Sequence, residues 1–158
     1  MKKILYIDMD NVLVDFPSAL ARVNPEILEK YENNLDDIPG IFSLMDPVEG
    51  ALESFKVLSE KFDVYILTTA PWNNPSAWSD KLLWVKKYLG ESAYKRLIIT
   101  HHKNLNKGHY LVDDRDRNGA YAFEGTLIRF DSTRFPNWKA VTSYLLNGLE
   151  SPESKLLF

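Results

Sequence analysis

Two carboxylates, Asp8 and Asp10, stand two residues apart directly after the apolar run Ile4–Ile7. Most Asp-x-Asp pairs are turn or capping residues, because short acidic side chains bond readily to nearby backbone N–H groups. Here the apolar run predicts a buried strand, and a carboxylate without a partner at its end is costly in free energy. We therefore regard Asp8 and Asp10 as candidates for chemistry.

Two threonines, Thr68 and Thr69, follow the apolar pair Ile66-Leu67 in the same way. A hydroxyl group and exposed backbone N–H groups at the end of a strand can hold a phosphate oxygen. The more ordinary role of such a threonine is to cap the next turn, and taken alone these residues favour that role.

The remaining candidates are Lys103 and the run Asp113-Asp114-Arg115. A single lysine indicates little, since most lysines are solvated surface charges. Two adjacent carboxylates after the apolar run Tyr110–Val112 are more specific, because they repel each other unless a cation or a basic group balances them. A hard divalent cation is the simplest balance, and Mg²⁺ usually keeps few protein ligands beside water and phosphate.

The pattern of hydrophobic residues predicts an α/β scaffold for these groups. Short apolar runs alternate with helical patterns, which is typical of a Rossmann-like parallel sheet in three layers, flanked by helices. The predicted strands are Lys3–Ile7, Asp63–Leu67, Leu97–Thr100, Tyr110–Val112 and Gly125–Phe130. Because open parallel sheets bind ligands at the carboxyl ends of their strands, we expect the acidic and hydroxyl residues along one edge.

A core helix is predicted to begin at Asp46, where Asp46 can cap it, Pro47 suits the first helical position and Glu49 stands three residues after the cap. Further helices are predicted along the stripe Trp78, Leu82, Val85 and Leu89, ending near Gly90, and over Trp138–Leu146. Between the first strand and the core helix, breakers interrupt the apolar positions and predict short helices. We expect the tail from Ser151 onward to be loose.

Composition narrows the class of protein. The chain has 158 residues, of which 45% are hydrophobic and 26% charged, as in one globular domain with a modest insertion. It has no cysteine, which excludes a disulfide framework and thiol catalysis and fits the reducing cytoplasm, where we expect the protein. The formal charge of −3 argues against binding a nucleic acid polymer, and no apolar run approaches a membrane span.

Taken together and in this order, the four groups resemble the motifs of the haloacid dehalogenase superfamily of phosphohydrolases, over nearly the whole chain. A closer similarity, to the 5′(3′)-deoxyribonucleotidases, is carried by Asp8–Phe16, Leu67–Pro71, Lys103 and Val112–Arg115. The segment Phe42–Leu52 resembles the return from the small helical cap of that family. Asn11 departs from the glycine common in the superfamily, and we expect asparagine to tolerate the turn.

The resemblance implies a division into two parts and a set of catalytic roles. Residues 1–15 and 47–158 would form the phosphatase core, and residues 16–46 a small helical cap inserted in it. Asp8 would attack phosphorus to form an aspartyl-phosphate, while Asp10 would protonate the leaving oxygen and then activate water. The Asp8 and Asp113 carboxylates and the Asp10 backbone carbonyl would hold Mg²⁺, and Asp114 would orient metal-bound water.

The resemblance also implies the substrate contacts. The residues expected to bind phosphoryl oxygens are Thr68, Thr69 and Lys103. Those expected to face the base from the cap are Phe16, Phe42 and Met45. Phe16 could stack on a base, as aromatic groups do in nucleotide sites, although all three could instead be core residues of the cap.

The reaction expected from these features is Mg²⁺-dependent hydrolysis of (deoxy)nucleoside monophosphates to nucleoside and phosphate. Three alternatives stay open: a related phosphatase of another small phosphate ester, a signalling receiver, and a non-catalytic phosphate-binding protein. A receiver retains its phosphate and needs no general acid, so Asp10 argues against it. The sequence leaves open the sugar, the phosphate position, the base and the oligomeric state, a homodimer included.

Overall fold

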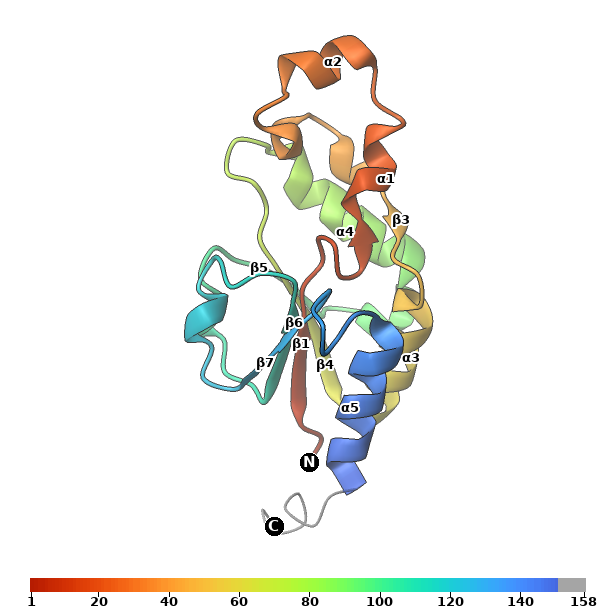
Figure 1. The fold of residues 1–158 in the computed structure, drawn as a ribbon, viewed down its shortest axis with the longest axis vertical. Coiled ribbons are helices and arrows are strands. Elements are labelled where there is room, and N and C mark those ends of the chain that lie inside the picture. Colours follow the sequence, from red (N-terminus) through yellow and green to blue (C-terminus); the bar gives the residue numbers. More distant parts are fainter. Residues whose placement is uncertain (151–158) are drawn as a thin grey trace.

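Five apolar runs pair into one parallel sheet in the computed structural model, which describes residues 1–150 (Figure 1). The strands are β1 (Ile4–Ile7), β4 (Asp63–Thr68), β5 (Leu97–Ile99), β6 (Tyr110–Asp113) and β7 (Thr126–Arg129). They lie in the order β5-β4-β1-β6-β7. Each coincides with a predicted strand to within a residue at either end, so the α/β fold is confirmed.

The order of the strands creates a binding position in the centre of the sheet. From β1 the chain moves outward through β4 to β5, and it then returns to β6 on the other side of β1 before reaching β7. The direction of winding therefore reverses between β1 and β6, which is where open α/β sheets form a crevice at their carboxyl edge. Asp8 and Asp113 end these two strands, and the Asp8 backbone N–H donates to the Val112 carbonyl at 2.8 Å.

The two faces of the sheet are covered differently. One face packs against α3 (Ala51–Lys61), α4 (Ser76–Tyr88) and α5 (Trp138–Glu150), and side chains such as Leu5 and Ile7 point into this core. The opposite face carries a smaller cluster around Tyr6, which is covered mainly by short 3₁₀ turns. Within residues 1–150, the 3₁₀ turns outside the segment 16–46 are η3 (Gly90–Ala93), η4 (Lys103–Leu105) and η5 (Ala120–Ala122). Ala120 of η5 belongs to the smaller cluster, whereas Ala93 of η3 belongs to the larger core. The alternation along β1 gives the layers their separate cores.

The segment of residues 16–46, called the insert below, forms short helices above the carboxyl edge of the sheet (Figure 1). Its elements are α1 (Phe16–Leu20), α2 (Pro25–Lys30), η1 (Leu35–Asp37) and η2 (Ile41–Ser43). The chain enters through β2 (Val14–Asp15) and leaves through β3 (Asp46–Pro47), which pair antiparallel. The two connections therefore run side by side.

The core helix does not begin at Asp46 as predicted. Asp46 is a strand residue whose carboxylate pairs with Arg22 at 2.7 Å, and its backbone N–H donates to the Ser18 hydroxyl. α3 begins at Ala51, after Gly50 in a left-handed conformation with a φ of +77°. Arg22 and Ser18 of the insert therefore bind Asp46, which the local sequence pattern assigned to the cap of the helix.

The stripe predicted on α4 is also partly wrong. Trp78 and Leu82 are about 40% exposed, whereas Lys81, Trp84 and Val85 are buried. α4 is covered on one side by the sheet and on another by η2 of the insert, so its buried face is displaced from the one predicted. The helix does end at Tyr88, near the predicted stop at Gly90, which has a φ of +56°.

A buried amide fastens the insert to the loop before α4. The Asn74 side chain is 1% exposed, and its Nδ2 donates to the backbone carbonyls of Asp36 at 2.8 Å and Ile38 at 3.0 Å. Its Oδ1 accepts from the Ser76 hydroxyl, which in turn accepts from the Gly40 N–H. These bonds fix η1 and η2 over the edge of the sheet.

No helix within residues 1–150 is long and apolar enough to cross a membrane. The tail from Ser151 onward, expected to be loose, lies outside the described residues.

Candidate active site

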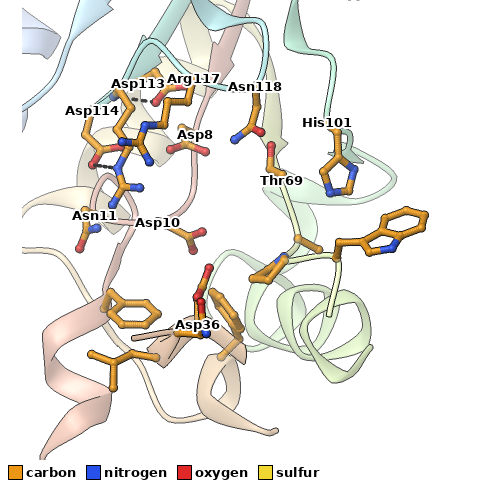
Figure 2. Close-up of a pocket in the computed structure, with 18 of the residues that line it drawn as sticks. Asp8, Asp10, Asn11, Asp36, Thr69, His101, Asp113, Asp114, Arg117 and Asn118 are labelled. Carbon is orange, nitrogen blue, oxygen red and sulfur yellow. Dashed lines mark hydrogen bonds and ion pairs between the residues drawn. The ribbon is translucent and has the colours of Figure 1, made fainter. Parts of the chain in front are cut away.

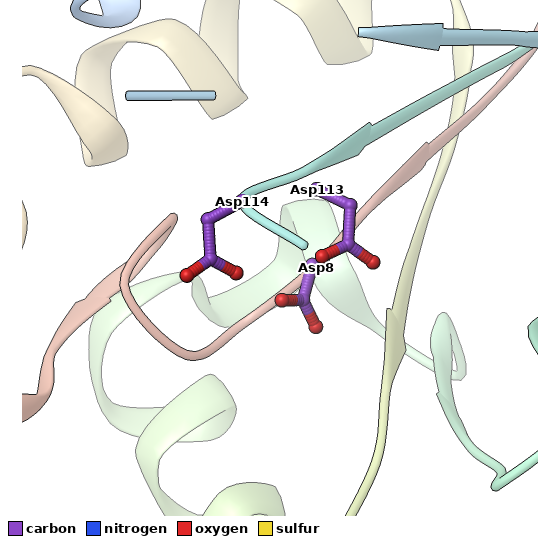
Figure 3. A group of neighbouring side chains, drawn as sticks. All are labelled: Asp8, Asp113 and Asp114. Carbon is purple, nitrogen blue, oxygen red and sulfur yellow. The ribbon is translucent and has the colours of Figure 1, made fainter. Parts of the chain in front are cut away.

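Three carboxylates converge where β1 and β6 end. Oxygen atoms of Asp8, Asp113 and Asp114 lie within 4.8 Å of one another, as Figure 3 shows. Asp8 is 6% exposed and Asp113 only 2%. Carboxylates this close and this poorly hydrated repel one another strongly, so the group needs positive charge nearby.

Lys103 supplies one such charge from η4. Its Nζ atom lies 2.8 Å from Asp8 Oδ1 and 2.6 Å from Asp113 Oδ2. Burial raises the pKa of Asp8 to about 7 against the lowering effect of Lys103, and burial likewise raises the pKa of Asp113. Burial and repulsion from Asp8 raise the pKa of Asp114 to about 6. Burial of Lys103 acts to lower its pKa, but the charges of Asp8 and Asp113 outweigh burial and raise it.

The donor set suits a hard divalent cation. Three carboxylates face one another, and the single lysine among them leaves the group with an excess of negative charge. Burial is the main cause of the raised pKa values of Asp8 and Asp114, and repulsion between neighbouring carboxylates adds to it. Mg²⁺ takes oxygen ligands, few of them from protein, which matches this cluster.

A tight turn after β1 carries Asp10, whose charge is close enough to Asp8 to help raise the pKa of that carboxyl. The Met9 carbonyl accepts from the backbone N–H groups of Leu13 at 2.9 Å and Val14 at 3.0 Å. Asn11 has a φ of +58°, a left-handed conformation that asparagine adopts more readily than most residues. The expectation that asparagine tolerates this turn is confirmed.

Lys81 is a residue of the site that the sequence analysis missed. It belongs to α4, is 0% exposed, and donates from Nζ to Asp10 Oδ1 at 2.8 Å and to the Thr68 hydroxyl at 3.0 Å. The signal was present in the sequence, because Lys81 stands within the helical face between Ala77 and Trp84. A lysine on the apolar side of a helix is unusual unless its charge has a partner.

The two threonines have different positions. Thr69 lies beside the cavity described below, and its hydroxyl donates to the Thr100 carbonyl at 2.7 Å. Thr68 is 0% exposed and accepts its bond from Lys81 beneath the cavity wall.

A cavity of about 570 Å³ lies between the carboxylates and the insert. Figure 2 shows Asp8, Asp113 and Asp114 on one side of it, with Asp36 of the insert pointing toward Asp10 from the other. The volume is within the range of small-molecule sites.

Phe16, Phe42 and Met45, the residues of the insert expected to face the base, differ in their positions relative to the cavity. Phe16 and Phe42 line the cavity and pack edge to face, with ring centroids 5.9 Å apart. Phe42 is 2% exposed and one ring face is covered by the Lys81 ammonium, 4.5 Å from its centroid. Met45 is buried and is not among the residues lining the cavity.

Loop residues that the sequence analysis did not select complete the wall. They include Asn33, Asn34 and Asp36 of the insert, and Arg117 and Asn118 after β6. His101 also lines the cavity and contacts the Trp72 ring at 5.7 Å between centroids. None of these positions has a local pattern that distinguishes it from an ordinary polar loop.

Comparisons with known proteins agree with this architecture. Residues 18–140 match the family described as 5′ nucleotidase, deoxy (pyrimidine), cytosolic type C protein. A protein of Vibrio phage KVP40, provisionally named a 5′(3′)-deoxyribonucleotidase, is 55% identical over 91% of this chain and 85% of its own length. The 5′(3′)-deoxyribonucleotidase of Bacillus subtilis is 30% identical over 92% of this chain and its whole length.

Solved structures support the fold alone, because their identities are low. A haloacid dehalogenase-like hydrolase from Xanthomonas campestris has a TM-score of 0.56 at 8% identity, covering 92% of this chain and 95% of that one. The magnesium-bound hydrolase YfnB from Bacillus subtilis has a TM-score of 0.56 at 12% identity, covering 86% and 90%.

Proposed function

The chain belongs to the cytosolic type C 5′-nucleotidase family of the haloacid dehalogenase superfamily, and from this membership we propose that it hydrolyses deoxynucleoside monophosphates to nucleoside and phosphate. As a member of that family it is a phosphoric monoester hydrolase. The observation that carries the proposal is the pairing of Lys103 with both Asp8 and Asp113 at the point where the sheet reverses its winding.

Asp8 is the nucleophile in this proposal. One of its carboxylate oxygens is held by Lys103, which leaves the other free to form a bond to phosphorus as the ester P–O bond breaks. Phosphoryl transfer depends mainly on alignment and on neutralising the spread negative charge. A buried carboxylate fixed by a lysine provides the alignment.

Asp10 is the general acid and base. In its protonated form it gives a proton to the departing sugar oxygen, and as a carboxylate it then takes a proton from the water that hydrolyses the aspartyl-phosphate. Its position on the turn after β1, close to Asp8 and with Oδ1 held by Lys81, supports this assignment.

Mg²⁺ would be held by the Asp8 and Asp113 carboxylates with the Asp10 backbone carbonyl, with Asp114 beside them, and would supply charge neutralisation for the phosphoryl group. Lys103 and Thr69 bind phosphoryl oxygens, Lys103 as a cation and Thr69 through its backbone N–H. The sequence also predicts Thr68 as a phosphoryl ligand; because its side chain is fully buried and its hydroxyl is bonded to Lys81, we assign it instead to the support of this wall.

The insert serves as a cap over the sugar and base, with residues 1–15 and 47–158 as the core. Phe16 offers a half-buried ring at the cavity wall, and this supports stacking against a base. Phe42 supports the ring of Phe16 from the side, and Met45 packs within the cap. The cysteine-free composition supports a cytoplasmic enzyme.

The test is phosphate release from deoxy- and ribonucleoside monophosphates and simple sugar phosphates, with Mg²⁺ and with a chelator. We expect Mg²⁺-dependent release that favours deoxynucleotides. Phe16→Ala should raise KM for nucleotides about tenfold, because a stacked base contributes about 1–3 kcal/mol, and should leave KM for an aryl phosphate unchanged. Release from sugar phosphates alone would discard the nucleotide assignment, and no release from any ester would discard the enzyme.

A further inference from the structure

Lys81 is a charged side chain with no exposed surface. A buried ammonium is costly unless paired charges and hydrogen bonds compensate the loss of hydration. Its position at the centre of α4, packed between the insert and the sheet, shields it from solvent on every side. The groups that Lys81 contacts must therefore offset the free energy lost when its ammonium is buried.

The ammonium has three partners in three directions. It donates to Asp10 Oδ1 at 2.8 Å and to Thr68 Oγ1 at 3.0 Å, and it lies 4.5 Å from the centroid of the Phe42 ring. An ammonium has three N–H donors and no hydrogen-bond acceptor, so these three contacts can use all of its donors. The ring face of Phe42 is attractive to a cation, which makes the third contact favourable as well.

The three partners come from different parts of the molecule. Asp10 lies on the turn after β1, Thr68 ends β4, and Phe42 belongs to η2 of the insert. Lys81 is therefore the point at which the turn carrying the general acid, the sheet and the insert meet. The Lys103 ammonium, by contrast, pairs with the carboxylates at the ends of β1 and β6.

We propose that Lys81 is a positioning residue that fixes Asp10 for proton transfer and ties its placement to the insert through Phe42. This proposal depends on the proposed function. With Oδ1 held by Lys81, Asp10 has one oxygen left to carry the proton, and the carboxylate plane cannot rotate away from the cavity. Lys81 itself contacts neither substrate nor phosphorus.

Two substrates separate positioning of Asp10 from general damage to the site. A nucleotide releases a sugar oxygen that must be protonated as it leaves, whereas an aryl phosphate such as p-nitrophenyl phosphate releases a stable anion that needs no proton. The first step of the aryl reaction is therefore independent of Asp10, while hydrolysis of the aspartyl-phosphate still requires it.

The test variant is Lys81→Met, which keeps an unbranched side chain against Phe42 and removes the ammonium. For the nucleotide we expect kcat to fall about 100-fold with KM nearly unchanged, the scale of a lost acid–base contribution. For p-nitrophenyl phosphate we expect a rapid burst of one nitrophenolate per enzyme, followed by slow turnover. A merely structural defect would slow the burst as well and so contradict the proposal.

The matched control is Lys87→Met, on the same helix. Lys87 is exposed and also lies over an aromatic ring, 4.8 Å from the centroid of Tyr88, but it is away from the cavity. We expect its kinetics to equal those of the unmodified chain. Lys81→Arg, which keeps the charge and the donors, should recover at least tenfold of the lost kcat.

Coupling to Asp10 is measured by a double variant. Asp10→Asn should lower nucleotide turnover as Lys81→Met does, and combining the two should cost little more than Asp10→Asn alone. Full additivity would overturn the proposal, as would unchanged kcat in a Lys81→Met protein that keeps its thermal unfolding midpoint. An unmodified chain that releases phosphate from no substrate would instead count against the proposed function.

Discussion

Asp8 loses nearly all of its hydration when the chain folds, and its placement beside Asp113 and Asp10 adds repulsion. Its pKa is about 7 in the folded chain and near the ordinary value of 3.8 when unfolded. The folded state therefore binds more protons than the unfolded state between these values. Because stability rises with pH only where the unfolded state binds more protons, it must fall here.

Metal-free protein should thus become less stable as the pH rises from about 4 to about 7, by an amount on the order of 3 kcal/mol from Asp8. Urea unfolding in the presence of a chelator measures this directly. Asp8→Asn should remove the part of the decline that Asp8 contributes, since an amide does not titrate in this range, and should leave a part that comes from Asp113 and Asp114. A decline of equal size in both proteins would assign it to other groups.

At the level of single residues, the sequence indicates which side chains meet at the candidate site better than it indicates what holds them. Asp8 and Asp113 could be selected because carboxylates directly follow apolar strands. Lys81 could not be paired with Asp10 in advance, because the two are 71 residues apart and meet only after α4 packs over the sheet.

One buried amide contributes to the attachment of the insert. Asn74→Ala removes both donors to the carbonyls of Asp36 and Ile38 and the acceptor of the Ser76 hydroxyl. Leaving such groups unpaired costs about 1–3 kcal/mol. We expect the free energy of unfolding to fall by about 2 kcal/mol and limited proteolysis within residues 31–40 to accelerate.

Asn73→Ala is the matched control, because Asn73 is the exposed neighbour in the same loop. It should leave both the free energy of unfolding and the proteolysis rate within experimental error. Equal proteolysis of the two variants would mean that the amide does not attach the insert, and that packing of η2 on α4 is sufficient.

The boundaries of helices and strands were predicted correctly where no contact distant in sequence opposed the local sequence signal. β4 and the end of α4 near Gly90 follow from strand composition and from glycine. The start of α3 was wrong because Asp46, Pro47 and Glu49 form a good local cap signal, yet pairing between β2 and β3 uses Asp46 as a strand residue. A contact distant in sequence overrode a local preference of similar strength.

On the scale of the whole described molecule, the carboxylate cluster faces a cavity between the sheet and the insert. The α/β architecture could be predicted because five apolar runs at the right spacing allow few other arrangements. The shape of the cavity could not, since part of its far wall consists of exposed polar residues from 3₁₀ turns and loops. Residues such as Asn34 and Asn118 reach the cavity only through the path of the backbone.

Two buried tryptophans each donate an indole hydrogen bond to a backbone carbonyl. Trp138 connects α5 to the turn after β1, and Trp84 connects α4 to the insert. Trp138 Nε1 donates to the Val12 carbonyl on the turn that carries Asp10, at 2.8 Å. Trp84 Nε1 donates to the Met45 carbonyl near the end of the insert, at 2.9 Å. The side chains are 1% and 3% exposed, so each serves as the control for the other.

Trp138→Phe and Trp84→Phe should each lower the free energy of unfolding by about 1–3 kcal/mol, since each leaves a buried carbonyl without its donor.

The kinetic effects of the two tryptophan substitutions should differ. Trp138→Phe loosens the turn that carries Asp10 and should lower kcat for every ester. Trp84→Phe loosens the insert and should raise KM for nucleotides while sparing p-nitrophenyl phosphate, whose small group needs less of the insert. If both variants lowered kcat equally for both substrates, core and insert would act as one unit, and substrate choice could not be assigned to the insert.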